Sequence, residues 1–497
     1  MSALSDRTRL GLEILAAAAL LGVACDVLLR AMPWGLNAFS CTAGLVAVAT
    51  WIVRRRRIPA GGDTPWLAVA ALLLGSNFVA RDSHALRAFD AVGIAITLSL
   101  ASLSLRGVAL RGCSTWQYLR AGLTTAASAG VGVVPLLGRD VRWSELPSGG
   151  ALRHARAVGI GTLLALPLLL VFGGLFASAD AVFGNLMAGV LDVDFAAITS
   201  HTFLIGFWTA LIAGYLAGAL LPETPRRVAA DPPGFSLGIV PVGTALGLLD
   251  LLFLVFVVVQ LRYFFGGTDL IHGRTGLTYA EYARRGFFEL VAASALVLPV
   301  LLGADWALRD ATRRQQRTFR CLAAALLVLL SVVMASALER MRLYVDEFGL
   351  SEIRLYATAF MVYLAAVLAW FAWTVLRGLR RRFAFGALVQ GFAVLAGLHL
   401  LNPDAFIVRT NLARPTGHRA FDALYAASLS ADAVPDLLAA FPQLDEREKC
   451  RAADGLLKRW TRDDDWRTWN LSRARARRVV HEHAASLSAL PCKEYAR

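Results

Sequence analysis

The chain has 497 residues, of which 57% are hydrophobic and only 17% are charged, and its mean hydropathy is +0.57. A soluble domain carries roughly 25% charged residues, so this composition excludes an ordinary soluble protein. The formal net charge of +14 does not indicate a nucleic-acid partner, because the arginines flank apolar blocks as they do in membrane proteins.

The apolar residues come in blocks of about 17–25 residues, the length at which a helix crosses a bilayer. A transmembrane β-barrel would show shorter segments of alternating hydrophobicity. The first block has no cleavage site of the A-x-A type, so we expect a retained helix rather than a signal peptide. The sequence therefore predicts an all-α, polytopic transmembrane helical bundle. The expected spans are 10–29, 36–53, 65–80, 89–105, 157–177, 202–221, 237–261, 286–303, 320–338, 355–376 and 383–401.

Segment 118–138 ("YLRAGLTTAASAGVGVVPLLG") decides between about eleven spans and twelve. It is rich in Gly, Ala, Ser and Thr, so it partitions only weakly into a membrane. If it does not cross, the arginine clusters at 54–57 and 380–382 fall on the same side as the N-terminus, as the positive-inside rule requires. We therefore predict eleven spans, a re-entrant or interfacial 118–138 and a cytoplasmic N-terminus. Twelve spans are the alternative.

This topology divides the chain into three parts. Residues 1–150 form an N-terminal membrane part with four spans and segment 118–138, and residues 151–401 form a core membrane domain with seven spans. Residues 402–497, here called the tail, contain no long apolar run and are predicted to lie in the periplasm as a small soluble helical domain. Apolar residues of the tail recur at helical spacing, which predicts three or four helices.

Charged residues stand at the mouth of one span, in "TYAEYARRGFFEL" at 278–290. On a helix, Glu281, Arg285 and Glu289 share one face because they are four residues apart. Glu289 lies about one turn inside the span, where an isolated carboxylate is costly. These groups either anchor the helix end as an interfacial ion pair or form a polar site open to the outer face.

Two further polar stretches fall on the same predicted outer face, at 338–357 and 399–414. Three stretches with Arg, Glu, Asp, Tyr and Asn on one face predict a ligand-binding cluster. In this cluster the arginines attract an anionic group, the carboxylates orient them and the tyrosines lie at the interface. Its residues are Tyr282, Arg284, Arg285, Glu289, Glu339, Arg342, Asp346, Arg354, Tyr356, Asn402 and Asp404.

Three features lie elsewhere. Asp250 stands in the middle of a span and is a candidate for ion or proton coupling, although a hydrogen-bonded structural aspartate is an equal alternative. Cys450 and Cys492 are the two cysteines of the tail, and a periplasmic location would permit a disulfide between them. The lone His399 at the end of the last span is expected to be a packed residue. No motif indicates a catalytic residue, a metal site or a cofactor.

Several stretches together resemble one family, the bacterial polytopic membrane proteins grouped as domain of unknown function 4173, related to group 4153. The resemblance spans about residues 150 to 480 and implies a multi-pass protein of the bacterial inner membrane, without an assigned activity. The stretches are "YAEYARRGFFEL" (279–290), "RLYVDEFGLSEIRLYATAFM" (342–361), "NPDAFIVRTNLAR" (402–414), "LSADAVPDL" (429–437) and "WRTWNLSRARA" (466–476).

The leading functional hypothesis is a non-enzymatic membrane component that acts in transport, envelope maintenance or sensing. It would bind a small anionic ligand, a lipid headgroup or an envelope protein partner at its outer face, with the lipid bilayer around it and no nucleic acid. A proton- or ion-coupled secondary transporter that uses Asp250 is one alternative. A membrane enzyme that acts on a lipid or lipid-linked substrate, with Glu289 or Asp346 as its base, is another.

Overall fold

The computed structural model describes residues 4–146, 171–184, 195–221, 237–265, 287–308, 311–414, 421–461 and 465–492, together with a few isolated positions between 158 and 169. Within these ranges all regular secondary structure is helical, which confirms the predicted all-α fold.

Nine helices in the described ranges are long and apolar enough to cross a membrane. They and the shorter apolar helix α3 (Thr64–Ala80) coincide with the predicted spans, except that the segment 157–177 is described only in part. The count of eleven spans therefore stays a prediction. The nine helices are α1 (Asp6–Leu29), α2 (Leu36–Arg55), α4 (His84–Leu105), α9 (Phe195–Leu220), α10 (Ile239–Phe265), α13 (Phe287–Ala307), α14 (Arg313–Phe348), α15 (Glu352–Thr374) and α16 (Arg380–Leu401).

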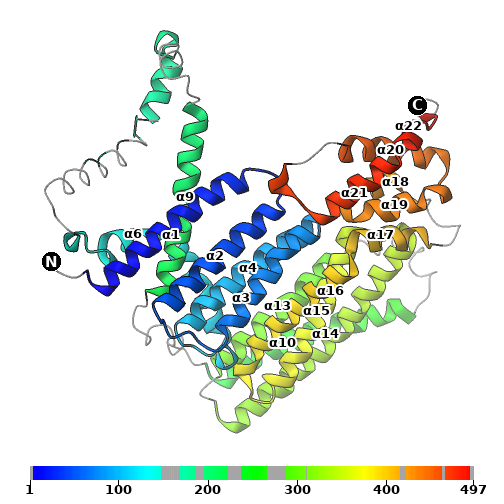
Figure 1. The fold of residues 1–497 in the computed structure, drawn as a ribbon. Helices are drawn as coiled ribbons and strands as arrows, with labels where there is room; N and C mark the ends of the chain where they lie inside the picture. Colours follow the sequence, from blue (N-terminus) through cyan, green and yellow to red (C-terminus); the bar gives the residue numbers. More distant parts are fainter. Residues whose placement is uncertain are drawn as a thin grey trace.

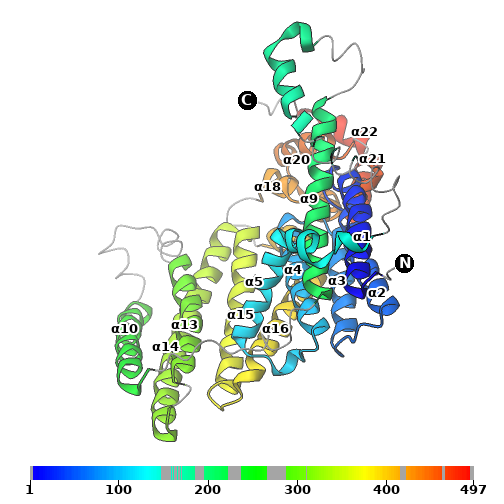
Figure 2. The same ribbon diagram turned by 90° about the vertical axis from the view of Figure 1, so that its left-hand side faces the viewer.

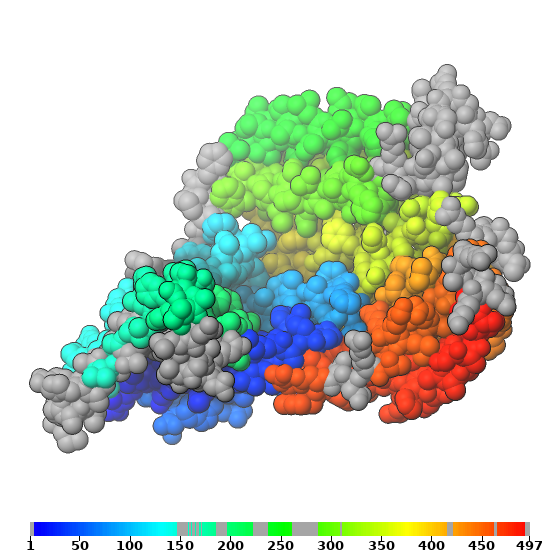
Figure 3. Space-filling model, turned by 90° about the horizontal axis from the view of Figure 1, so that it is seen from above, coloured from blue at the N-terminus to red at the C-terminus, as the bar shows by residue number. Residues whose placement is uncertain are grey.

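The helices stand side by side in an elongated bundle with two groups (Figures 1 and 2). One group contains α1 to α4, α9 and α5 (Thr115–Val131), and the other contains α10 and α13 to α16. Helix α16 joins the groups because it packs against both α4 and α5. Seen from above, the bright-green α10 lies at one edge of the molecule and the blue α1 and α2 lie toward the other (Figure 3).

The sides of the bundle are apolar. Large side chains such as Leu20 (75% exposed), Leu248 (63%) and Val328 (65%) point away from the protein on both groups of helices. Exposed apolar surface on this scale marks contact with a membrane.

Segment 118–138 is helical but broken. Helix α5 ends at Val131, and the residues Val133–Asp140 continue at an angle of 56° to it. Both ends of the segment lie at the same end of the bundle. Just before α5, the backbone N–H of Leu110 donates to Asp63 (3.0 Å), and after the bend Asp140 pairs with Arg7 in the first turn of α1 (2.6 Å). This placement fits a re-entrant segment, as the sequence predicts.

The described part of the tail contains six α-helices instead of the three or four expected. One predicted helix pattern, through Val480, Ala484 and Leu487, is split at His483, where α21 ends and α22 begins. The helices share one core, in which Leu437, Leu456 and Val480 are fully buried. They are α17 (Pro403–Leu412), α18 (Ala423–Ser428), α19 (Val434–Ala440), α20 (Glu446–Trp460), α21 (Leu471–Glu482) and α22 (Ala484–Ser488).

The tail packs onto the end of the bundle opposite Arg7 (Figures 1 and 3). It meets the beginning of α2, where the N–H of Leu36 donates to the carbonyl of Trp469 (2.9 Å). The tail also contacts the end of α3. In addition, it contacts the turn between α14 and α15, because Leu350 and Leu355 of that region pack into the core of the tail. The connections at 30–35, 81–83 and 349–351 thus gather beside the tail.

Candidate functional site

The turn between α14 and α15 is clamped to α17. Gly349 ends α14 with a φ of 81°, a left-handed conformation that favours glycine. The next residue, Leu350, exchanges two hydrogen bonds with the side-chain amide of Asn411, whose Oδ1 accepts (2.7 Å) and whose Nδ2 donates (2.8 Å). Arg414 adds a hydrogen bond to the carbonyl of Glu347 (3.0 Å). Two of the three polar stretches predicted to meet at the outer face are therefore in contact.

Arg354 lies in the first turn of α15, half-buried beside this clamp. Its guanidinium group stacks over the ring of Tyr344 (4.1 Å to the centroid) and donates to the carbonyl of Gly349. Stacking on an aromatic face stabilises a guanidinium group without neutralising its charge. Among the described residues, no carboxylate lies within ion-pair distance of Arg354.

Two cavities meet at Arg354 and Ser351. The first, of about 200 Å³, lies against the tail, and the polar residues of its lining include Asn411, Arg414, Tyr425 and Asp422. The second, of about 250 Å³, has a mainly apolar lining that includes Phe287, Phe288 and Ile353. The guanidinium group of Arg354 thus stands between a polar space beside the tail and an apolar space beside the membrane helices.

The remaining members of the predicted cluster are not gathered at Arg354. Glu289, Arg342 and Asp346 are exposed, Glu339 is half-buried, and none of these four pairs with another described side chain. Asn402 has a left-handed backbone at the junction of α16 and α17. The other predicted members lie elsewhere: Tyr356 contacts Ser83, Asp404 contacts Ser430, and Tyr282, Arg284 and Arg285 lie outside the described residues.

A buried polar cluster holds the tail to the bundle, and we call it the docking cluster: Asp82, Asp404, Ser430, Asp432, Ser472 and Arg473. Arg473, only 2% exposed, donates to Asp82 (3.0 Å). The carboxylate of Asp432 accepts the backbone N–H groups of Asp82 (2.7 Å) and Ser83 (3.2 Å), and the carboxylate of Asp82 accepts that of Ala431 (3.3 Å). The loop after α3 and the loop before α19 therefore bind each other reciprocally.

The local sequence does not reveal the docking cluster. Asp82 and Arg473 are 391 positions apart, and neither belongs to a recognisable binding motif. One signal was present: three of the stretches that carry the family resemblance contain Asp404, Asp432 and Arg473. Their meeting in space shows that these stretches build one interface.

Asp404 is the most enclosed acid of the docking cluster. One carboxylate oxygen accepts the backbone N–H of Ser430 (3.3 Å) and its hydroxyl group, while the other is buried without a hydrogen-bond partner among the described residues. Burial raises the pKa of Asp404 to about 7; the hydrogen bonds of Ser430 oppose this shift, and the negative charges of Glu352 and Asp432 add to it.

A second buried pair lies deeper in the bundle. Asp90 of α4 is fully buried, accepts a hydrogen bond from Asn77 (2.9 Å) and contacts Nε2 of His399 (3.0 Å). His399 is therefore packed against an acid at the end of α16.

The other two predicted features are isolated from Arg354. Both carboxylate oxygens of Asp250 in α10 are buried and have no hydrogen-bond partner in the described part of the chain. The sulfur atoms of Cys450 and Cys492 lie 2.17 Å apart, which places a disulfide between α20 and the end of the tail. No group of three metal-ligating side chains occurs within the described ranges.

A bundle of membrane-length helices capped by a helical tail defines a polytopic membrane protein. The chain belongs to the family described as "Domain of unknown function (DUF4153)", which matches residues 68–440. Group 4153 is the relative of group 4173, which several stretches of the sequence resemble. Membership of group 4173 itself is not shown. The match includes Asp82, Arg354, Asp404 and Asp432 and ends before Arg473. No curated protein and no solved structure matches the chain.

We expect Arg473→Ala to weaken the docking of the tail on the bundle. Loss of one partner of a buried ion pair costs about 3–5 kcal/mol, because the remaining carboxylate stays buried. The measurement is the thermal midpoint of the detergent-solubilised protein, with protease cleavage between the bundle and the tail as a second readout. Arg475→Ala, which removes an exposed arginine of the same helix, is the control and should change neither value. Equal stability of the two variants would contradict the docking role.

Asp404 should make stability depend on pH. Because its folded pKa of about 7 lies above the ordinary value, the folded state holds a proton that the unfolded state has lost. Its contribution to stability is therefore full below about pH 4 and is lost as the pH rises to about 7, by roughly 1.4 kcal/mol per pH unit. The difference in thermal stability between Asp404→Asn and the wild type should shift in favour of the variant as the pH rises from 5 to 8. Asp454→Asn, at an exposed acid, should show a constant difference.

Proposed function

We propose that this protein is a non-enzymatic membrane component that binds an anionic lipid headgroup at Arg354, on the end of the bundle that carries the tail. One observation carries the proposal: a half-buried guanidinium group without a described carboxylate partner stands between a polar and an apolar cavity. A lipid has the matching division, with a charged headgroup beside an apolar chain.

The two cavities support this division of roles. In the polar cavity, Arg414, Asn411 and Tyr425 can donate hydrogen bonds to phosphate oxygens near Arg354. In the apolar cavity, the exposed side chains of Phe288 (56%) and Ile353 (67%) form a surface for acyl chains at the edge of the bundle. A small soluble anion would use the polar cavity alone.

We place the protein in the bacterial inner membrane, with the N-terminus in the cytoplasm and the tail in the periplasm. The arginine clusters at 54–57 and 380–382 support this orientation, since both lie at the end of the bundle away from the tail. The bonded geometry of Cys450 and Cys492 supports it as well, because disulfides persist in the oxidising periplasm. The headgroup would then belong to the outer leaflet, where the protein could act in envelope maintenance, transport or sensing.

Arg354→Gln tests the proposal. In a neutral detergent, phosphatidylglycerol should bind to the wild type more tightly than phosphatidylcholine, and the variant should lose about tenfold in affinity for phosphatidylglycerol. Native mass spectrometry of the protein with each lipid measures the bound fraction. Arg342→Gln, at an exposed arginine of α14 that lines neither cavity, is the matched control. Unchanged phosphatidylglycerol binding by Arg354→Gln would refute the site, and binding of glycerol phosphate alone would identify a soluble ligand.

Asp250 favours a second candidate function, proton- or ion-coupled transport. A mid-span carboxyl group whose oxygens are buried without a described partner is by default a candidate for ion handling. No observation favours the enzymatic alternative, since its two proposed bases, Glu289 and Asp346, are both exposed.

Transport can be tested in proteoliposomes that contain a pH-sensitive dye. If Asp250 couples proton movement, the wild type should dissipate an imposed pH gradient, and Asp250→Asn should do so at least about tenfold more slowly. Asp346→Asn, at an exposed acid, should behave as the wild type. Equal rates for all three proteins, or no flux above that of empty liposomes, would exclude coupling through Asp250.

A further inference from the structure

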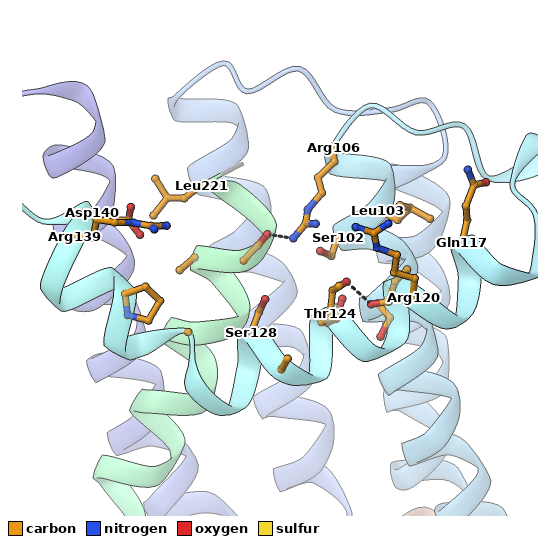
Figure 4. A pocket seen from close by; sticks show the side chains of 18 of the residues that line it. Ser102, Leu103, Arg106, Gln117, Arg120, Thr124, Ser128, Arg139, Asp140 and Leu221 are labelled. Atoms are coloured by element: carbon orange, nitrogen blue, oxygen red, sulfur yellow. Dashed lines mark hydrogen bonds between the residues drawn. The ribbon is translucent and has the colours of Figure 1, made fainter. Parts of the chain in front are cut away.

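A second cavity with a charged lining lies at the opposite end of the bundle from the tail. Its volume is about 420 Å³, and it is enclosed by the beginning of α1, the end of α4, α5 and the end of α9 (Figure 4). Four arginines from separate segments line it: Arg7, Arg106, Arg120 and Arg139. Among the described residues of the lining, Asp140 is the carboxylate, and it pairs with Arg7 (2.6 Å).

Hydroxyl groups complete the lining. Ser102 and Thr125 are buried, and they face the same space as Thr124 and Ser128. Figure 4 shows Arg106 entering the cavity from the end of α4 and Arg120 from α5. Arg106 also donates to the carbonyl of Gly218 at the end of α9, which fixes its direction. The cavity thus presents guanidinium and hydroxyl donors from several helices to one space.

The cavity exists because α5 crosses α9 in close contact and then turns. Glycines permit this approach: a Cβ atom on Gly214 of α9 would lie 2.2 Å from the carbonyl oxygen of Ser128, and one on Gly132 would lie 3.0 Å from the carbonyl oxygen of Gly214. The 56° bend at Gly132 then carries Arg139 and Asp140 back along the cavity wall. The broken segment 118–138 therefore forms one side of a site.

We propose that this cavity binds a phosphate-bearing anion. Guanidinium groups recognise phosphate through paired, charge-assisted hydrogen bonds, and hydroxyl groups supply further donors. The volume lies within the usual range of small-molecule sites. Membrane orientation alone would require only that arginines lie at this end of the bundle. It does not explain why Arg106 and Arg120 are half-buried and line a common cavity.

The phosphate group can come from an inner-leaflet phospholipid or from a soluble phosphorylated compound, since the cavity lies at the predicted cytoplasmic end of the bundle. Both sources share the recognised chemistry. This site is independent of Arg354, which lies at the other end of the bundle.

The test uses the full chain in neutral detergent, with pyrophosphate as the soluble probe and a short-chain phosphatidylglycerol as the lipid probe. Isothermal titration calorimetry measures the affinity for each. The double variant Arg106→Gln/Arg120→Gln removes two lining charges. The matched control, Arg313→Gln/Arg314→Gln, removes two exposed charges at the same end of the bundle. Thr124→Phe keeps every charge and fills the cavity, so it separates binding inside the cavity from general attraction to a basic surface.

At least one probe should bind to the wild type and to the control with similar affinity. The double variant and Thr124→Phe should each weaken that binding by about tenfold or more. Binding of pyrophosphate alone or of phosphatidylglycerol alone would identify the source of the phosphate group. Thr124→Phe gives the answer if the double variant does not fold.

Two results would overturn the proposal: no binding of either probe, or equal binding by the wild type, the control and Thr124→Phe. Arg354→Gln should leave pyrophosphate binding unchanged, so failure at this site and failure at Arg354 can be told apart.

Discussion

The buried ion pair between Arg473 and Asp82 is the constraint on which the arrangement of the tail depends. Removing both charges from water costs several kcal/mol, and the structure offsets this with hydrogen bonds from Ala431 to the carboxylate and from the guanidinium group to the carbonyls of Pro33 and Thr468. A pair of this kind favours one position of the tail, because a shifted tail would separate Arg473 from Asp82 and leave the carboxylate with only the more distant Arg87 (3.7 Å). The tail therefore has one favoured position on the bundle.

The docked position of the tail determines how the neighbouring elements of the bundle are arranged. With the tail docked, α17 lies beside the turn between α14 and α15, and Asn411 holds the backbone of Leu350 in place. Arg354 is then enclosed by groups from the bundle on one side and from the tail on the other. At the opposite end, the cavity lined by Arg106 and Arg120 is built by the bend after α5 and needs no residue of the tail. The two proposed sites thus lie at opposite ends of the bundle and differ in construction.

The sequence allowed prediction of the structural features that depend on a local pattern of residues. Apolar length located the helices, and Arg354 belonged to the expected outer-face cluster because it lies in a polar stretch between two spans. The docking cluster escaped prediction because Asp82 and Asp432 are 350 positions apart and only the fold pairs them. The number of tail helices was wrong because helices of five to seven residues, such as α18, α19 and α22, are shorter than two turns and show no readable period. The cavity beside α5 depends on a bend that composition does not indicate.

The docking cluster joins the third span to nearly the last helix of the chain, and this has a consequence for biosynthesis. Asp82 is made and inserted early, whereas Arg473 leaves the ribosome after every span has been synthesised. Until then, Asp82 lacks Arg473, and Arg87, which lies within ion-pair distance of it in the folded chain (3.7 Å), is the other cation beside it. A chain shortened before Arg473 would lack this closure, so the position of the tail depends on a contact that forms late in synthesis.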